Sequence, residues 1–506
     1  MIPRILPFRI AALAAVAALS WLAAPGPAAA ADVQDQLPEM GTAAESTLSL
    51  EDERRIGQMV MRGLRESGRV IEDPETNEYL QSLGLRLSSL ANQGNRQFNF
   101  FLVNDPSINA FALPGGFIGI HTGLLLATRD ESELAGVYAH EISHVTQRHI
   151  ARSIDAGGKS SLVSTAATLA AIILGAIAGV GSNATLGAIT VAQGLAAQAQ
   201  LNFTRENEYE ADRVGISLMA QAGFDPNAMG SFFEEMEHRT QLAPDQIPEL
   251  LRSHPVTSNR IAEARARAAQ YPQPVVRDSI GYAVTRERVR VLTTPAGQDP
   301  RAYYASLIGS EADNSIAEAY GKALAQMVAG DPKSAVPTFE RLVAAHPEIM
   351  QFHTALAQAL VASGDTRAGL QVLEKARELA PRNVPVTVRY AEALLKAGRP
   401  KRAHEVLLDL FNNVPPSQDQ IRLTAIAANA AGDVADAYSY MAEYHLMSGD
   451  LPLAANQLEL ALSVPGLTAV QRSRYEARLR EIRDAMPQDR QRMEQQPAGG
   501  SRPPGG

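Results

Sequence analysis

The chain has 506 residues, 45% of them hydrophobic, and this length predicts two or three globular domains. The formal net charge is −9 and no long basic run is present, which excludes binding to nucleic acid through a basic surface. The absence of cysteine excludes disulfides, cysteine metal ligands, thiol catalysis and an acylated lipoprotein, and it is compatible with an oxidising compartment.

The first 31 residues have the pattern of a secretory signal peptide. Arg4 and Arg9 precede an uncharged apolar run over 10–24, which is followed by a Pro-Gly-Pro break and a run of alanines. A membrane anchor is the less favoured alternative, because the apolar run is short for a span. We therefore expect residues 1–31 to be removed on export to the periplasm of a Gram-negative bacterium, with residues 32–50 forming a mobile N-terminal segment.

Residues 51–270 combine helical and strand patterns. Amphipathic spacing predicts helices, and runs of aromatic and β-branched residues predict strands. The expected elements are helices over 53–68, 76–91 and 131–152 and strands over 98–103 and 117–121.

The last of these helices carries the pattern His-Glu-x-x-His at residues 140–144. Residues four apart lie on one face of a helix, so His140 and His144 can direct two imidazole nitrogens at one metal ion. Glu141 lies beside them and can accept a proton from metal-bound water. The motif by itself indicates a zinc hydrolase.

A catalytic zinc needs a third protein ligand. Metzincins place a glycine and a histidine where this chain has Gln147 and Ile150, so that class is excluded. His149 lies nine residues beyond His140, and a continuous helix would point it away from the metal, as a surface or supporting residue.

The segment 206–212 is the best source of the third ligand. Glu208 and Asp212 are four residues apart and share a helical face. One of them can bind the metal while the other accepts the second N–H of a ligand histidine. Glu206 and Glu210 fall on other faces and are expected to be solvated.

Residues 162–200 form an Ala- and Gly-rich stretch with three interpretations. Its length permits a membrane span, but glycines interrupt it within an otherwise exported domain. A buried or oligomer-contact helical hairpin is favoured, and a mobile apolar lid that contacts a membrane surface is the third interpretation.

The C-terminal part contains a 34-residue repeat. Glycines recur at this period, followed by a small residue five positions later, and in the first three units by a large apolar residue and a closing proline. This pattern predicts tetratricopeptide repeats over 315–485, preceded by a linker over 271–314 and followed by a disordered tail over 486–506. The repeating positions are Gly330, Gly364, Gly398 and Gly432; Ala335, Gly369, Ala403 and Ala437; Phe339, Leu373 and Leu407; and Pro347, Pro381 and Pro415.

Taken together, these motifs resemble the zinc metallopeptidase family of the CAAX prenyl proteases and HtpX. The resemblance rests on the His140 to His144 motif, on Glu208-x-x-Ala211-Asp212, on the stretch 110–116 before the motif, and on Ser253-His254-Pro255 with Arg260 downstream. It implies an α+β zincin-like domain, mostly helical with a small sheet, followed by an all-α repeat solenoid.

The resemblance also implies roles for individual residues. His140, His144 and Glu208 would hold one Zn²⁺ per subunit, Glu141 would be the general base, and Asp212 would support a ligand histidine. His254 would either stabilise the oxyanion or occupy the open zinc position and keep the enzyme latent. In this family the strand before the metal helix is a sheet edge, so 117–120 is expected to hold an extended substrate by strand addition.

The signal peptide and the repeats narrow the resemblance to periplasmic members that act on outer-membrane β-barrel proteins. The implied function is a zinc endopeptidase that cleaves misfolded or stalled barrel proteins, with repeats that dock to the β-barrel assembly machinery. The alternative is a chaperone or scaffold whose protease activity is small or latent.

Overall fold

The computed structural model describes residues 48–91, 96–157, 204–243, 247–272, 274, 279–307 and 315–486. All of them belong to one compact unit that spans residues 47–506. The predictions for the signal peptide, for residues 162–200 and for the tail after residue 486 lie outside the described residues. Within the described ranges, no helix combines the length and the apolar composition needed to cross a membrane.

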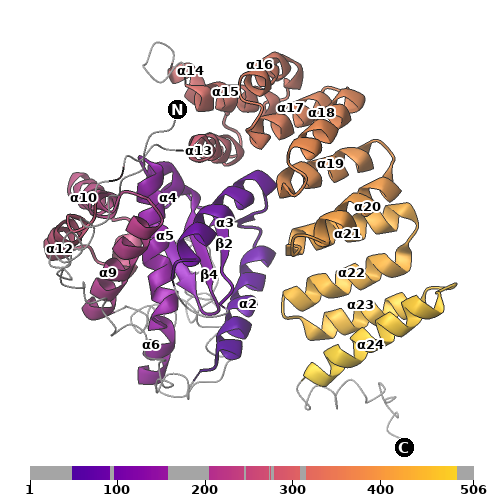
Figure 1. The fold of residues 1–506 in the computed structure, drawn as a ribbon, viewed down its shortest axis with the longest axis horizontal. Coiled ribbons are helices and arrows are strands. Elements are labelled where there is room, and N and C mark those ends of the chain that lie inside the picture. The colour runs from indigo at the N-terminus through magenta and orange to yellow at the C-terminus, as the bar shows by residue number, and fades with distance from the viewer. Residues whose placement is uncertain are drawn as a thin grey trace, which may run out of the picture. The chain divides into compact units, whose positions relative to one another are not determined.

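A four-stranded mixed sheet lies among the helices of the first half (Figure 1). The strands are β1 (Val70–Ile71), β2 (Asn99–Val103), β3 (Ala110–Leu113) and β4 (Phe117–His121), in the order β1-β2-β4-β3. Strands β2 and β4 are parallel, and the two outer pairings are antiparallel. The strands expected over 98–103 and 117–121 are confirmed, whereas β1 and β3 were not predicted because they are too short to show an alternating pattern.

The order of the strands corrects one expectation. Strand β4 lies between β2 and β3, so the sheet edge next to the metal-motif helix is β3 and not 117–120. The reason is the turn at Gly115 and Gly116, whose φ angles of 81° and 85° fold β3 back onto the outside of β4. A Cβ at Gly116 would lie 2.3 Å from the carbonyl oxygen of Gln97, so a side chain cannot be accommodated there.

Polar caps begin the long helices of this half. Ser49, Asp73, Asp130 and Thr204 each accept a backbone N–H from the first turn of the helix that follows. The helices are α2 (Leu50–Glu66), α3 (Pro74–Ser88), α4 (Thr122–Ala127), α5 (Glu131–Thr146), α6 (His149–Gly157), α9 (Arg205–Gln221), α10 (Asn227–Leu242), α11 (Glu249–Ser253) and α12 (Ser258–Ala268).

Helix α5 is the central element of this half, and all of its residues are buried. It contacts the sheet through β3 and β4 and packs closely against α9 (Figure 1). Gly215 of α9 permits this approach, because a Cβ there would lie 3.2 Å from the backbone nitrogen of His140. The sequence signal for α5 is therefore its cap and motif, since a helix buried on all sides has no amphipathic stripe.

The helices from α15 onward form successive pairs. Gly330, Gly364, Gly398 and Gly432 end the first helix of each of the first four pairs with φ between 69° and 98°, which is why glycine recurs there. The predicted packing positions are buried, including Ala335, Phe339, Leu373 and Leu407. The helices are α15 (Ile316–Val328), α16 (Pro332–Ala345), α17 (Met350–Ala362), α18 (Thr366–Leu379), α19 (Val384–Lys396), α20 (Pro400–Phe411), α21 (Gln418–Ala431), α22 (Val434–Met447), α23 (Leu451–Ser463) and α24 (Ala469–Ala485).

The segment expected to be a linker contains helices α13 (Ile280–Leu292) and α14 (Arg301–Ser306). Helix α13 packs against α3 and α4 of the first half and against α15 of the repeats. It therefore connects the two sets of helices through packed side chains.

A buried ionic cluster joins α3, α13 and α19. Arg288 donates to both Asp73 oxygens at 2.7 and 2.6 Å and to Glu75 at 2.9 Å, and its third nitrogen donates to the Tyr320 hydroxyl at 2.9 Å. Arg389 donates to both Glu75 oxygens at 2.9 and 2.6 Å and to Asp73 at 3.0 Å. Two carboxylates and two guanidinium groups balance in charge, which allows the cluster to be buried.

Candidate metal centre

Two histidines of α5 direct their Nε2 atoms at one point. His140 and His144 are four residues apart, and their Nε2 atoms are 3.0 Å apart. Both side chains are buried, with exposed fractions of 7% and 0%. The helical spacing therefore produces the two-nitrogen half of a metal site, as predicted from the motif.

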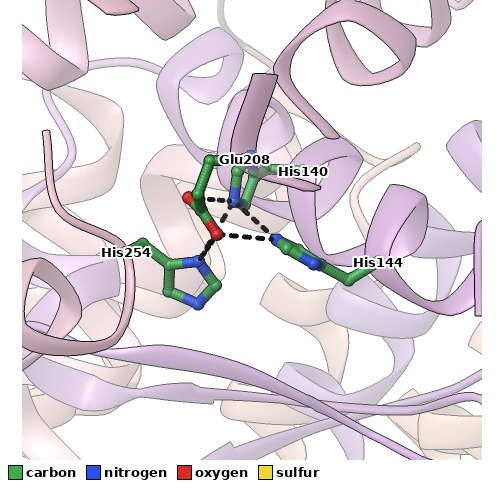
Figure 2. Close-up of side chains that lie close together, drawn as sticks. All are labelled: His140, His144, Glu208 and His254. Atoms are coloured by element: carbon green, nitrogen blue, oxygen red, sulfur yellow. Dashed lines mark hydrogen bonds and ion pairs between the residues drawn. The ribbon is translucent and has the colours of Figure 1, made fainter. Parts of the chain in front are cut away.

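Helix α9 brings a carboxylate to the same point. The Glu208 oxygens lie 3.5 Å from His140 Nε2 and 3.5 Å from His144 Nε2. Thr204 caps the helix one turn earlier, and the Glu208 side chain is 3% exposed. Figure 2 shows Glu208 facing the two histidine rings.

His254 follows α11 and provides a fourth donor. Its Nδ1 lies 2.9 Å from Glu208 Oε1 and 3.3 Å from His140 Nε2 (Figure 2). The loop is anchored because the backbone N–H of Leu250 donates to the carbonyl oxygen of Ile108 at 3.1 Å. Ligand atoms of His140, His144, Glu208 and His254 all lie within 4.8 Å of one another.

Buried charges support these donors from behind. Asp212, one turn after Glu208, places Oδ1 3.0 Å from His140 Nδ1. Arg260 of α12 donates to both Asp212 oxygens at 2.8 and 2.9 Å and lies 2.8 Å from Glu208 Oε2. Asp212 thus lies where the support predicted for a ligand histidine requires it, and that role stays a prediction. The contact of Arg260 with Asp212 could not be predicted, because nothing in the local sequence pattern relates the two residues.

His149 takes the supporting role that was one of its two expected roles, but it does not point away from the centre as a continuous helix would require. Helix α5 ends at Thr146, and α6 begins at His149 after a turn at Arg148 with φ 54°. The change of direction places His149 Nδ1 2.8 Å from His144 Nδ1. Glu210, expected to be solvated, lies 3.1 Å from His149 Nε2 through its Oε2 atom.

The electrostatics of the cluster favour a cation. Burial alone would lower the pKa of His140, but hydrogen bonds and charges from Asp212 and Glu208 outweigh it and raise the pKa to about 10. Burial, with His140 beside it, lowers the pKa of His144 well below its usual value. Burial would raise the pKa of Glu208, yet His254 and His140 hold it well below its usual range.

Glu141 lies next to the four candidate metal donors but is not one of them. Burial raises its pKa, while the nearby His254 and His140 and the backbone N–H of Ala112 act in the opposite direction. Its Oε1 is 3.7 Å from His254 Nε2. A buried carboxylate of this kind is available to accept a proton.

The donor set fits zinc. Two imidazoles and one carboxylate are the ligand types of zinc peptidases, with the fourth position left for water or substrate. A third imidazole, that of His254, stands at that fourth position here. The adjoining cavity has a volume of about 20 Å³ between the donors and the apolar side chains of Phe232, Phe233 and Val256, which is room for about one water molecule.

Comparison with known proteins agrees with this geometry. The model of peptidase family M48 matches residues 74–268, and tetratricopeptide repeat models match residues 320–383 and 360–426. The beta-barrel assembly-enhancing protease of Escherichia coli K12 is 34% identical over 457 residues, which cover 90% of this chain and 92% of that protein. This chain belongs to peptidase family M48.

Two further relatives match different shares of this chain. The putative beta-barrel assembly-enhancing protease of Vibrio cholerae is 35% identical over 460 residues, 90% of this chain and 94% of its own. The mitochondrial metalloendopeptidase OMA1 of Schizosaccharomyces pombe is 31% identical over 189 residues, 37% of this chain and 51% of its own. The match to family M48 covers the residues of the buried cluster, and the repeats follow it in the C-terminal part of this chain.

Proposed function

We propose that this chain is a periplasmic zinc endopeptidase in which His140, His144 and Glu208 hold one Zn²⁺ per subunit. The observation that carries the proposal is the convergence of these three buried donors with Glu141 beside them. The export signal predicted from residues 1–31 supports the location.

Glu141 performs the proton transfers in this proposal. When bound, zinc supplies a water of lowered pKa and polarises the scissile carbonyl. Glu141 accepts the proton of that water and passes it to the leaving amine. Burial raises the pKa of Glu141, and this brings a carboxylate closer to the range that suits both transfers.

His254 closes the centre in the arrangement observed. Its Nδ1 faces the same point as the other donors, and the cavity of about 20 Å³ has no room for a peptide. We propose that this is a latent form and that the loop after α11 must move before a substrate binds. The alternative role, stabilisation of the oxyanion, requires His254 to remain near the centre during cleavage.

Strand β3 is the proposed guide for the substrate backbone. It is the sheet edge beside α5, which carries Glu141, and its residues Phe111 and Ala112 are partly exposed. An extended peptide that pairs with β3 would run past the metal centre. Backbone pairing accepts many sequences, which suits a protease of misfolded chains.

The test of the chemistry is Glu141→Gln beside the wild type. Purified Glu141→Gln should contain one zinc per subunit and cleave no casein, because the amide keeps the shape of the side chain without its basicity. Retained cleavage in this variant would defeat the mechanism.

His254→Ala separates the two roles of this histidine. Raised casein cleavage with zinc retained would identify a latent enzyme, which is the expected result. Lost cleavage with zinc retained would instead assign His254 to the oxyanion.

The proposed substrates are misfolded or stalled outer-membrane β-barrel proteins, and the proposed partner of the repeats is the β-barrel assembly machinery. The names of the related proteases support this, as do the predicted export signal and the repeats. The second candidate function, a chaperone or scaffold, is favoured by the closed centre.

Surface substitutions in the repeats test the partner more cleanly than deletion, because deletion would strip Arg389 from the buried Glu75. A cavity of about 420 Å³ between α15, α17, α18 and α19 is lined by Val328 and Lys396. Val328→Glu with Lys396→Glu should reduce cross-linking to the assembly machinery and leave casein cleavage unchanged. Val470→Glu on α24 is the control, since Val470 is 77% exposed and lies outside this cavity.

A further inference from the structure

The backbone at Arg148 is held in a conformation that side chains disfavour. Among the described residues, Arg148 alone combines a side chain with a positive φ, 54°. Such a conformation persists where the surroundings impose it. Here Arg148 donates from Nε and Nη2 to Glu53 Oε1 at 2.9 and 2.7 Å, and from Nη2 to the carbonyl oxygen of Leu48 at 2.6 Å. Glu53 is 5% exposed, so a buried ion pair with α2 fixes the turn.

The turn brings His149 against the back of the metal centre. The His149 ring is fully buried, with Nδ1 2.8 Å from His144 Nδ1 and Nε2 3.1 Å from Glu210 Oε2. Arg152 lies 3.2 Å from the same Glu210 oxygen and donates to Asn207 Oδ1 at 3.1 Å. A row of side chains therefore runs from α9 through His149 to His144.

The positions of the protons follow from which atoms face the centre. His144 directs Nε2 at the other donors, so that atom must present a lone pair to a metal and the ring proton must lie on Nδ1. That Nδ1–H can donate only to an acceptor, so His149 Nδ1 must be unprotonated. The ring proton of His149 then lies on Nε2 and is donated to Glu210. With this arrangement of protons, each hydrogen bond from His144 through His149 to Glu210 has one donor and one acceptor.

We propose that His149 is a positioning residue that, with Glu210 behind it, fixes the tautomer and the ring orientation of His144 for metal binding. The inference rests on the metal role proposed above for His144. Three acidic residues of α9 then have separate roles. Glu208 joins the donors, Asp212 supports His140 directly, and Glu210 supports His144 through His149.

The Arg148 turn explains why an intermediate histidine is used. Asp212 reaches His140 directly, at 3.0 Å. Glu210 contacts the His149 ring, and that ring in turn contacts His144. The positive φ of Arg148 turns the chain back toward α5, so that the His149 ring lies against His144. The strained turn is therefore part of the support of the centre.

The experiment measures zinc affinity of the full chain by competition with a chromophoric chelator. His149→Phe keeps a buried ring without hydrogen bonds and should weaken zinc binding by about 10- to 100-fold. His149→Gln keeps one acceptor and one donor and should recover most of the loss. Thermal unfolding of the metal-free protein serves as the second readout, and we expect His149→Phe to change it little because the ring volume is retained.

Glu210→Ala tests the outer end of the row, where the side chain is 28% exposed and folding is not at risk. It should weaken zinc binding several-fold, while Glu206→Ala, on the same helix with an exposed side chain, should not. Zinc binding by His149→Phe and by Glu210→Ala equal to that of the wild type would overturn the inference. If the wild type itself takes up no zinc, the proposed function fails, and that result is distinguishable from a failure of the row alone.

Discussion

At the scale of single residues, His121 shows what burial does to a titratable group outside the metal centre. It ends β4, is 1% exposed, and places Nδ1 2.8 Å from the Ser107 hydroxyl, while its Nε2 has no hydrogen-bond partner among the described residues. Burial lowers the pKa of His121 to about 4; Asp105 opposes this shift and Arg69 adds to it. The ring is therefore neutral in the folded protein at any pH near neutrality.

The stability of the fold should consequently fall as the pH falls. The unfolded chain protonates His121 below about pH 6.5, while the folded chain resists protonation until about pH 4. Between these values His121 contributes a loss of up to about 3 kcal/mol in the free energy of unfolding. Urea unfolding at pH 7 and pH 5 of the wild type and His121→Asn should show a smaller pH dependence in the variant. Equal pH dependence in both would contradict the assignment.

Asp212 permits a second prediction at this scale. Asp212→Asn keeps an oxygen for His140 Nδ1–H but removes the negative charge that Arg260 contacts twice. Zinc affinity should fall by about 10- to 100-fold, as is typical when a support of a ligand histidine is changed. Chelator competition measures it, and Asp299→Asn on the exposed surface is the control. An unchanged affinity would show that the charge of Asp212 does not support the centre.

The residues that the sequence identifies best are those whose spacing is itself the signal. His140 and His144 follow from helical geometry alone, and Glu208 and Asp212 share a face in the same way. The contacts of Arg260 with Asp212 and of Glu210 with His149 could not be predicted, because they depend on how α9, α12 and α6 pack. A supporting role for His149 could be predicted, but its contact with His144 could not, because no local sequence pattern predicts a positive φ at Arg148.

At the scale of elements, the separation of α5 and α9 sets the geometry of the centre. Gly215 lies two turns after Glu208 on the face that packs against α5. An added Cβ would lie 3.2 Å from the carbonyl carbon of Ala139 and from the nitrogen of His140, and backbone atoms within a buried helix cannot yield easily.

Gly215→Ala should therefore move Glu208 away from the histidines. We expect a destabilisation of about 1–3 kcal/mol together with weaker zinc binding, since overpacking in a core costs this much. Denaturant unfolding and chelator competition measure the two effects. Gly281→Ala in α13 is the control, because its Cβ would make an ordinary contact of 3.5 Å with Tyr79. If both variants bind zinc as the wild type does, the helix spacing does not control the site.

Prediction of elements succeeded where periodicity was long and failed where it was short. Helices α2 and α3 begin at polar caps and show an apolar stripe, so their existence follows from the sequence. Strand β3 has only four residues, and its place outside β4 depends on the Gly115-Gly116 turn. The sheet edge could not be assigned without knowing that this turn reverses the chain.

At the scale of the whole molecule, the cluster around Glu75 connects the peptidase half to the repeats. The Glu75 side chain is fully buried and the Arg389 side chain is 12% exposed, so their ion pair is removed from solvent. Removing one partner of a buried ion pair costs more free energy than the intact pair contributes to stability, because the other charge stays buried without a partner.

Arg389→Ala should destabilise this contact by about 3 kcal/mol or more for that reason. Hydrogen exchange should show faster opening of the α3 and α19 amides, with little change in α23 and α24. Arg402→Ala on α20 is the control, since its pair with Glu405 is solvent-exposed. Unchanged exchange in α3 would mean that the cluster does not hold the two sets of helices together.

The repeats were the most predictable part of the molecule, because a period of 34 residues is visible without any knowledge of tertiary contacts. Their contact with α3 through Arg389 was not predictable, since the residues involved are more than 300 positions apart. The exact domain limits, including those of the linker, remain predictions, although α13 shows that residues within it pack on both sides.

The closeness of the two Nε2 atoms, 3.0 Å, has a thermodynamic consequence. Two lone pairs at that distance would repel each other. Burial would lower the pKa of His140, but Asp212 and Glu208 raise it, which favours a proton between the two nitrogens when no cation is bound. Zinc binding at neutral pH therefore releases a proton from His140 to the solvent. The heat of zinc binding should depend on the ionisation enthalpy of the buffer, and the apparent affinity for zinc should rise as the pH rises.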